Sequence, residues 1–169
     1  VRVHRLRALS DAILVGRHTA ALDNPSLTTR IWPGRDPQRL VIDREGVLDL
    51  GLKLFDDTAK TVVFTEVFRD YGRTKSVDQI QLDFGKDVLP QMMRFLYEHK
   101  VQRLLVEGGS MLLQSFINAG LWDEAYVEVA PFTLGGGVLA PHIEDDCPKE
   151  QFGCFGHQIW HFLHEKHIF

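Results

Sequence analysis

The chain has 169 residues, of which 44% are hydrophobic and 25% charged, the composition of an ordinary globular domain. Its formal net charge of −4 argues against a general nucleic-acid-binding role. No apolar run approaches the ~20 residues that a membrane-spanning helix needs, and no signal-peptide pattern opens the chain. We therefore expect a cytoplasmic protein with no membrane segment, and a single domain over residues 1–169.

Helical spacing of apolar residues predicts two helices in the first hundred residues. Residues 1–9 predict the tail of a helix whose arginines, Arg7 among them, lie on the surface. Residues 88–99 predict a second helix, with Asp87 as its N-terminal cap.

Short apolar runs between these helices predict strands. The segments 10–16, 39–43 and 60–65 each contain an apolar run with the length and composition of a buried strand. The alternation of apolar and polar residues over 78–83 predicts an edge strand. Strands of this kind are typical of an α/β domain with a mostly parallel sheet.

The stretch 103–116 predicts a strand, a glycine turn and a helix. Gly108 and Gly109 interrupt the apolar strand 104–107, and apolar residues then recur at helical spacing. Two glycines let the backbone approach a ligand closely, and the N–H groups of a helix start attract phosphate. Glu107 stands at the carboxyl end of the strand, where open α/β sheets bind ligands. The alternative is that the glycines only turn the chain.

A polar loop follows the first predicted strand. Residues 23–30 contain the carboxylate of Asp23 and the guanidinium of Arg30, and Thr19 precedes them. Arginine binds phosphate through two hydrogen bonds, and loops at strand ends often carry chemistry. The alternative is that Asp23 caps a turn with Asn24.

The last third of the chain combines alternation with glycine and histidine clusters. Residues 125–129 predict a strand with one wet face, 141–156 a loop, and 159–163 a final strand. The three glycines at 135–137 suggest close backbone approach to a ligand or another strand. Four histidines crowd the C-terminal end: His157, His161, His164 and His167. No Cys or carboxylate evidently completes a zinc site with them, so we expect no metal.

Several motifs follow one another in a characteristic order. They are S-D-A-I-L-V-G from Ser10, D-N-P-S-L-T-T-R from Asp23, V-I-D from Val41, V-E-G-G from Val106, L-W-D-E from Leu121 and L-G-G-G from Leu134. Together they resemble the reductase domain of the bacterial bifunctional riboflavin-biosynthesis protein, RibD. The resemblance covers nearly the whole chain. It implies a dihydrofolate-reductase-like α/β fold, with a mostly parallel central sheet flanked by helices and an antiparallel C-terminal edge.

The resemblance also implies an activity. Members reduce 5-amino-6-(5-phosphoribosylamino)uracil to its ribitylamino form with NADPH, delivering hydride to ribose C1′ after the sugar opens to an imine. The small-molecule phosphate is then the partner, with no nucleic acid and no membrane, and the protein is a homodimer. Three alternatives stay open: a reductase of the diaminopyrimidine before deamination, another dihydrofolate-reductase-like enzyme, and a non-catalytic nucleotide-binding or dimerisation module.

By matched position, the resemblance assigns roles to residues of the two motif loops. Thr19 and Asp23 face the nicotinamide side of the cofactor site. Leu27 and Arg30 hold the substrate, Arg30 through its 5′-phosphate, and Glu107 contacts the substrate. Asp23 and Glu107 are the candidate catalytic residues, Asp23 as proton donor or charge stabiliser.

The remaining cofactor contacts follow in the same way. Arg44, which directly follows the strand 39–43, stands at a cofactor-contacting position and is suited to pair with a 2′-phosphate; its alternative role is a solvated turn residue. The cofactor phosphates are cradled by Gly109, Ser110, Met111, Leu112, Leu113, Gln114 and Ser115.

Two departures from the family are visible. The opening segment of the family's reductase domain, roughly K-x-A-x-S-x-D-G, has no match, so we expect a chain truncated at its N-terminus relative to the family, with a gap in the sheet. The zinc signature of the deaminase half, H-x-E with P-C-x-x-C, is also absent from these residues, so we expect no deaminase activity from them.

Overall fold

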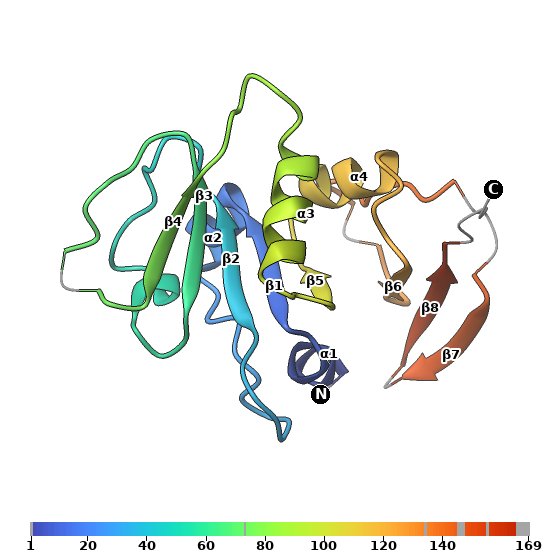
Figure 1. Cartoon of the computed structure of the whole chain (residues 1–169). Coiled ribbons are helices and arrows are strands. Elements are labelled where there is room, and N and C mark those ends of the chain that lie inside the picture. The colour runs from blue at the N-terminus through green and yellow to red at the C-terminus, as the bar shows by residue number, and fades with distance from the viewer. Residues whose placement is uncertain (1, 73, 134, 145–147, 155, 165–169) are drawn as a thin grey trace. The chain divides into compact units, whose positions relative to one another are not determined.

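The computed structural model describes residues 2–72, 74–133, 135–144, 148–154 and 156–164 (Figure 1). The chain forms two compact units, Val1–Gly109 and Ser110–Phe169. Leu134 and His167, which entered the sequence argument, lie outside the described residues. The expectation of one domain over the whole chain stays a prediction.

The first unit is built on a parallel five-stranded sheet with the order β4-β3-β2-β1-β5. The strands are β1 (Ala12–Gly16), β2 (Gln38–Ile42), β3 (Thr61–Thr65), β4 (Val77–Gln81) and β5 (Leu104–Val106). The helical elements are α1 (Arg2–Leu9), α2 (Arg17–Asp23), α3 (Val88–Glu98) and the 3-10 turn η1 (Lys53–Phe55). The predicted parallel sheet is confirmed, with β4 at its edge as the alternation indicated.

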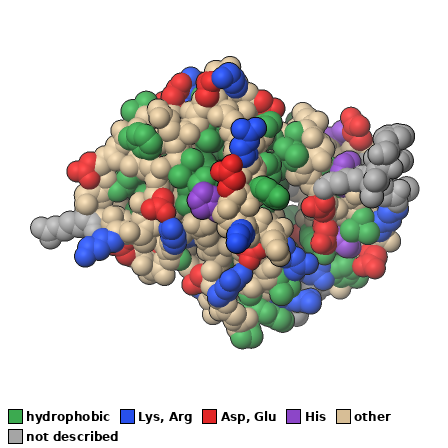
Figure 2. All heavy atoms as spheres, viewed as in Figure 1, with side chains coloured by type: hydrophobic (Ala, Val, Ile, Leu, Met, Phe, Trp, Pro, Cys, Tyr) green, Lys and Arg blue, Asp and Glu red, His purple; other side chains and the backbone are tan. Residues whose placement is uncertain are grey.

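The surface carries mixed charge. On the face shown in Figure 2, Lys and Arg side chains are interspersed with Asp and Glu. Among the described residues, no helix is both long and apolar enough to cross a membrane.

One face of the parallel sheet is covered by α3 (Figure 1). Asp87 caps this helix, its side chain accepting a hydrogen bond from the Leu89 N–H at 3.1 Å. The rings of Phe64 in β3 and Phe95 in α3 meet edge to face, with centroids 5.4 Å apart. Burial on both faces explains why β1 and β3 are apolar without alternation.

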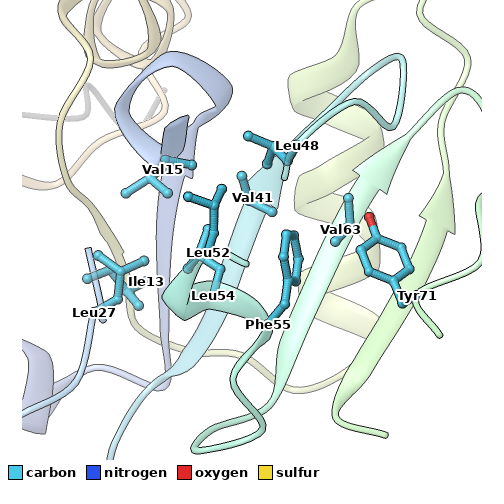
Figure 3. Packing of buried hydrophobic residues seen from close by; sticks show 11 residues of the cluster. Ile13, Val15, Leu27, Val41, Leu48, Leu52, Leu54, Phe55, Val63 and Tyr71 are labelled. Carbon is cyan, nitrogen blue, oxygen red and sulfur yellow. The ribbon is translucent and has the colours of Figure 1, made fainter. Parts of the chain in front are cut away.

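The opposite face packs against the irregular segment that follows β2. Figure 3 shows the resulting cluster. Its strand residues are Ile13, Val15, Val41 and Val63, and its loop residues include Leu27, Leu48, Leu52, Leu54 and Phe55. The segment 46–57, expected to be irregular with a short helical turn, therefore supplies four of the eleven residues of this cluster.

A fully buried arginine ties that segment to the sheet. Arg39 of β2 is 0% exposed, and its guanidinium donates to Thr61 Oγ1 at 3.0 Å, to the Lys53 carbonyl at 2.8 Å and to Asp56 Oδ1 at 3.1 Å, and also to the Ala59 carbonyl. A buried charge is tolerated only when it is paired and hydrogen-bonded in this way. Arg39 therefore has a structural role.

Three other buried polar atoms have no hydrogen-bond partner among the described residues, His4 Nδ1 being one of them. Among the described residues, Asp43 Oδ1 and Tyr71 Oη have no hydrogen-bond partner, although Asp43 Oδ2 accepts from the Leu48 N–H at 2.9 Å. Burial raises the pKa of Tyr71 to about 12; the Arg69 charge opposes this shift and the Asp43 charge adds to it. The tyrosine hydroxyl therefore stays neutral in the folded state well above the pH at which the unfolded chain ionises.

The second unit contains α4 (Ser110–Asn118) and an antiparallel three-stranded sheet with the order β6-β8-β7. The strands are β6 (Glu124–Val129), β7 (Glu150–Cys154) and β8 (His157–Leu163). The antiparallel character of the C-terminal strands is confirmed, and they form a sheet of their own. The predicted loop 141–156 is wrong at β7: this polar, glycine-containing segment becomes a strand because β8 supplies its backbone partners.

We expect the unfolding free energy of Tyr71→Phe to fall less than that of the wild type as the pH rises above 10. Because the pKa of Tyr71 is higher in the folded state than in the unfolded state, its contribution is fully present below pH 10 and is lost as the pH rises towards about 12. The difference between wild type and variant should reach about 2–3 kcal/mol over that range. Urea unfolding at several pH values measures it, and parallel stability curves would contradict the assignment.

Candidate functional site

The candidate site lies where the strand order of the parallel sheet changes direction. From β1, the chain adds β2, β3 and β4 on one side, whereas β5 pairs with β1 on the other side. Open α/β sheets bind ligands at the carboxyl ends of the strands beside such a point. Thr19 follows β1 there, and Glu107 and Gly108 follow β5, with the Glu107 N–H donating to the Leu14 carbonyl at 2.9 Å.

A paired arginine holds the Glu107 carboxylate. Arg7 Nε donates to Glu107 Oε1 at 2.9 Å and Arg7 Nη2 donates to Oε2 at 2.6 Å, while Arg7 Nη1 reaches the Thr28 carbonyl at 3.1 Å. The two side chains are 10% and 23% exposed. This two-point geometry is the strongest that an arginine and a carboxylate can adopt. Each oxygen of Glu107 keeps a lone pair with which to accept from a ligand.

Arg7 is therefore a site residue that the sequence argument missed. We expected it on the surface, but it is 8% exposed. The spacing in the sequence does not signal this burial, because Val3, four residues before Arg7, is exposed, whereas Ser10, three residues after it, is buried. Nothing in that spacing points to Glu107, one hundred residues away.

Gly108 touches Thr19 closely. Gly108 has φ +71°, and a Cβ placed on it would lie 2.8 Å from Thr19 Cγ2 and 3.3 Å from Thr19 Oγ1. Both the backbone conformation and the space therefore require glycine. The glycine turn after β5 thus packs against α2 at Thr19, which is half-buried.

The loop 23–30 adopts an unusual backbone. Asn24, Leu27 and Arg30 have φ values of +41°, +55° and +21°. Such conformations are costly for residues with side chains and persist where the surroundings impose them. Leu27 is 1% exposed and belongs to the core cluster, so only its backbone is free to face a ligand.

Asp23 and Arg30 are both exposed. Asp23 is the last residue of α2. Arg30 lines a cavity of about 480 Å³. The other lining residues are Ser26, Thr28, Thr29, Asp36, Lys53, Asp56 and Thr58. Hydroxyls and cations in one cavity are suited to a phosphate group.

Arg44 lies at the carboxyl end of β2 and pairs with Glu66, which follows β3. Its Nε donates to Glu66 Oε2 at 2.6 Å, and its guanidinium lies 5.5 Å from the centroid of the Phe84 ring. The hydrogen bond and charge of Glu66 raise the pKa of Arg44. The pair is exposed, and water screens the attraction between its charges, so an anionic ligand can replace Glu66 at low cost.

The predicted phosphate cradle runs from Gly109 into the first turns of α4. The helix begins at Ser110, as predicted. Within the second unit, Gln114 has its own partner: its Nε2 donates to the His142 carbonyl at 3.1 Å, and its Oε1 accepts from the His142 N–H at 2.8 Å. Met111 and Ser115 are exposed, while Ser110, Leu112, Leu113 and Gln114 are half-buried.

The second glycine run gives no sign of close packing. A Cβ on Gly135, Gly136 or Gly137 would meet nothing within 4 Å among the described residues. The suggested close approach of another strand is therefore wrong for this part of the structure. The described residues also contain no group of three or more His, Cys, Asp or Glu side chains that could hold a metal ion.

Comparison with known proteins decides the family. Residues 1–151 match the family model of the RibD C-terminal domain. The chain belongs to this family. The RibD resemblance and the dihydrofolate-reductase-like fold are thereby confirmed, and a reductase role in riboflavin biosynthesis is supported.

Similar proteins include both single reductases and bifunctional enzymes. The 2,5-diamino-6-ribosylamino-4(3H)-pyrimidinone 5′-phosphate reductase of Archaeoglobus fulgidus is 33% identical over 148 residues, covering 79% of this chain and 68% of that protein. The riboflavin biosynthesis protein RibD of Aquifex aeolicus is 32% identical over 138 residues, covering 80% and 39%. This chain of the RibD C-terminal domain family thus spans about two thirds of the archaeal reductase and less than half of that RibD protein.

A solved structure agrees with the fold. The diaminohydroxyphosphoribosylaminopyrimidine deaminase/5-amino-6-(5-phosphoribosylamino)uracil reductase of Thermotoga maritima superposes with a TM-score of 0.81 at 27% identity, covering 97% of this chain and 48% of that one.

We expect Arg7→Met and Glu107→Gln to destabilise the protein non-additively. Each single variant leaves a largely buried group without its partner and should cost about 3 kcal/mol of unfolding free energy. The double variant should cost at least ~1 kcal/mol less than the sum. Urea unfolding of all four proteins measures this coupling. Arg35→Met, which removes an exposed partner of Asp11, is the control and should cost under ~1 kcal/mol. Additive losses would contradict a direct pairing.

Proposed function

We propose that this chain is an NADPH-dependent reductase of a ribosylaminopyrimidine 5′-phosphate in riboflavin biosynthesis. The proposed substrate is 5-amino-6-(5-phosphoribosylamino)uracil, and the product is its ribitylamino form. The observation that carries the proposal is the V-E-G-G turn at the switch point. There Arg7 holds Glu107 and Thr19 packs on Gly108, in a chain that matches the RibD C-terminal domain.

The residues present fit a dinucleotide. Gly108 has no room for a side chain, and Gly109, at φ +78°, leads into the start of α4, whose N–H groups are suited to phosphate. We assign the nicotinamide side to Thr19 and Asp23, and the 2′-phosphate to Arg44. Bound NADPH supplies the hydride that reduces ribose C1′. The protein contributes position and charge.

Residues of the chain are proposed to bind the sugar phosphate and to assist the opening of the sugar ring. When the ribose opens, the C1′–O4′ bond breaks, O4′ takes a proton and a cationic imine forms at C1′. Asp23, exposed at the end of α2, is the proposed proton donor or charge stabiliser. Glu107, oriented by Arg7, accepts from sugar hydroxyls through its free lone pairs. The Leu27 backbone and the Arg30 side chain bind the phosphorylated end. A cytoplasmic homodimer completes the proposal, as the family resemblance implies.

The second candidate substrate is the diaminopyrimidinone that precedes deamination. It is favoured by the relative from Archaeoglobus fulgidus, a 2,5-diamino-6-ribosylamino-4(3H)-pyrimidinone 5′-phosphate reductase of which this chain covers 68%. The two candidates differ only in the pyrimidine, which none of the residues discussed above is assigned to contact.

The decisive assay follows NADPH absorbance with each pyrimidine in turn and then in competition. Oxidation that depends on one pyrimidine identifies the substrate. A chain that binds NADPH but reduces neither pyrimidine would support the non-catalytic module. Loss of turnover in Glu107→Gln, measured under conditions where the variant is folded, is expected from its proposed contact with the sugar.

We expect Arg44→Ala to lower the preference for NADPH over NADH. Removing the guanidinium deletes charge-assisted hydrogen bonds to the 2′-phosphate, so the KM for NADPH should rise about tenfold while that for NADH stays unchanged. The control is Arg35→Ala, another exposed arginine in an ion pair. An unchanged ratio of the two KM values would remove Arg44 from the cofactor site.

A further inference from the structure

The cavity beside the loop 23–30 contains a residue that no assignment above uses. Its polar lining comes from that loop, from η1 and from the segments that precede β2 and β3. The charged members are Arg30, Lys53, Asp36 and Asp56, and the hydroxyl groups belong to Ser26, Thr28, Thr29 and Thr58. Formal charge therefore balances to zero, and the partners of each group decide what the cavity can bind.

Both carboxylates of the cavity are already occupied. Asp36 Oδ1 accepts from the Thr29 N–H at 2.7 Å and from the Thr29 hydroxyl at 2.8 Å. Asp56 Oδ1 accepts from the buried Arg39 at 3.1 Å and from the Thr58 hydroxyl at 2.6 Å. Arg39 thus neutralises the charge of Asp56, whereas Asp36 is held by two neutral donors and keeps its charge.

Both cations of the cavity remain available. Within the part of the chain that the structure describes, the Arg30 and Lys53 side chains have no hydrogen-bond or ion-pair partner. The Thr28 hydroxyl donates to Ser26 Oγ at 3.2 Å, which leaves the Ser26 hydroxyl hydrogen free to donate. The unused groups are thus two cations and a donor, the set that a phosphate monoester requires.

The backbone of Lys53 is fixed on both sides. Its N–H donates to Asn24 Oδ1 at 2.8 Å, and its carbonyl accepts from Arg39 Nη1 at 2.8 Å. Asn24 belongs to the loop 23–30, so the base of the lysine is tied to the loop that carries Arg30. Thr28 connects the cavity to the candidate active site, because its carbonyl accepts from the arginine that holds Glu107.

We propose that Lys53 is a second phosphate-binding residue, which acts with Arg30 on the 5′-phosphate of the substrate. This assignment rests on the proposed reductase function for the identity of the ligand. The Thr28 carbonyl, which accepts from Arg7, links the cavity to the residue that holds Glu107, and the two cations neutralise the phosphate dianion. Lys53 contributes to affinity for the phosphorylated substrate and takes no part in the reduction.

The test is calorimetric titration of the protein with inorganic phosphate. Lys53→Met keeps the aliphatic stem and the backbone hydrogen bonds but removes the charge, so phosphate should bind about tenfold more weakly. Lys86→Met is the matched control, because Lys86 is an exposed lysine that pairs with Asp83 and does not line this cavity. Its phosphate affinity should equal that of the wild type. Equal affinity of Lys53→Met and wild type overturns the proposal.

Steady-state kinetics separate this proposal from the reductase function. With the phosphorylated pyrimidine, Lys53→Met should raise KM about tenfold and leave kcat unchanged, whereas Lys86→Met should change neither. If the wild type reduces the pyrimidine and Lys53→Met has an unchanged KM, the role of Lys53 is wrong and the reductase function stands. If phosphate binding depends on Lys53 but neither pyrimidine is reduced, the anion site stands and the reductase function fails.

Discussion

The pairing of Arg7 with Glu107 is the interaction on which the candidate site depends. It connects α1, the end of β5 and, through the Thr28 carbonyl, the loop 23–30. Taking both charges out of water is costly, and the cost is offset here because the guanidinium engages both carboxylate oxygens and also donates to a carbonyl. A ligand that contacts Glu107 therefore meets a carboxylate that is already oriented and needs no rearrangement of its own.

The charges at the carboxyl ends of the strands fall into two groups. Glu107 is largely buried and held, whereas the pairs Arg44–Glu66 and Arg17–Glu45 are exposed. Water screens the attraction between the charges of an exposed pair, so its members can change partners when an anion binds. The site thus combines one fixed carboxylate with cations whose partners can be replaced. This combination suits a ligand whose sugar must be oriented and whose phosphates are bound mainly by the positive charge of nearby side chains.

Buried polar residues organise the segment between β2 and β3, which has little regular structure. Arg39 fixes the stretch from Lys53 to Ala59, and Asp43 holds the Leu48 N–H. These contacts bring Leu48, Leu54 and Phe55 onto the sheet. The bond from Arg39 also fixes the backbone of Lys53 beside the cavity, so a polar residue that shapes the core positions one of the candidate ligand contacts.

The sequence by itself determined the local elements and the family. Apolar runs and glycines act over a few residues, so the strand, turn and helix of residues 103–116 were predictable, as were the parallel strands and the motif loops. Only the tertiary structure decided which distant groups meet. The partner of Arg7 lies one hundred residues away, the Leu27 side chain packs in the core so that only its backbone can face a ligand, and β7 exists because β8 pairs with it. The physical reason is that burial and hydrogen-bond satisfaction are properties of neighbours in space, which local spacing in a single sequence does not encode.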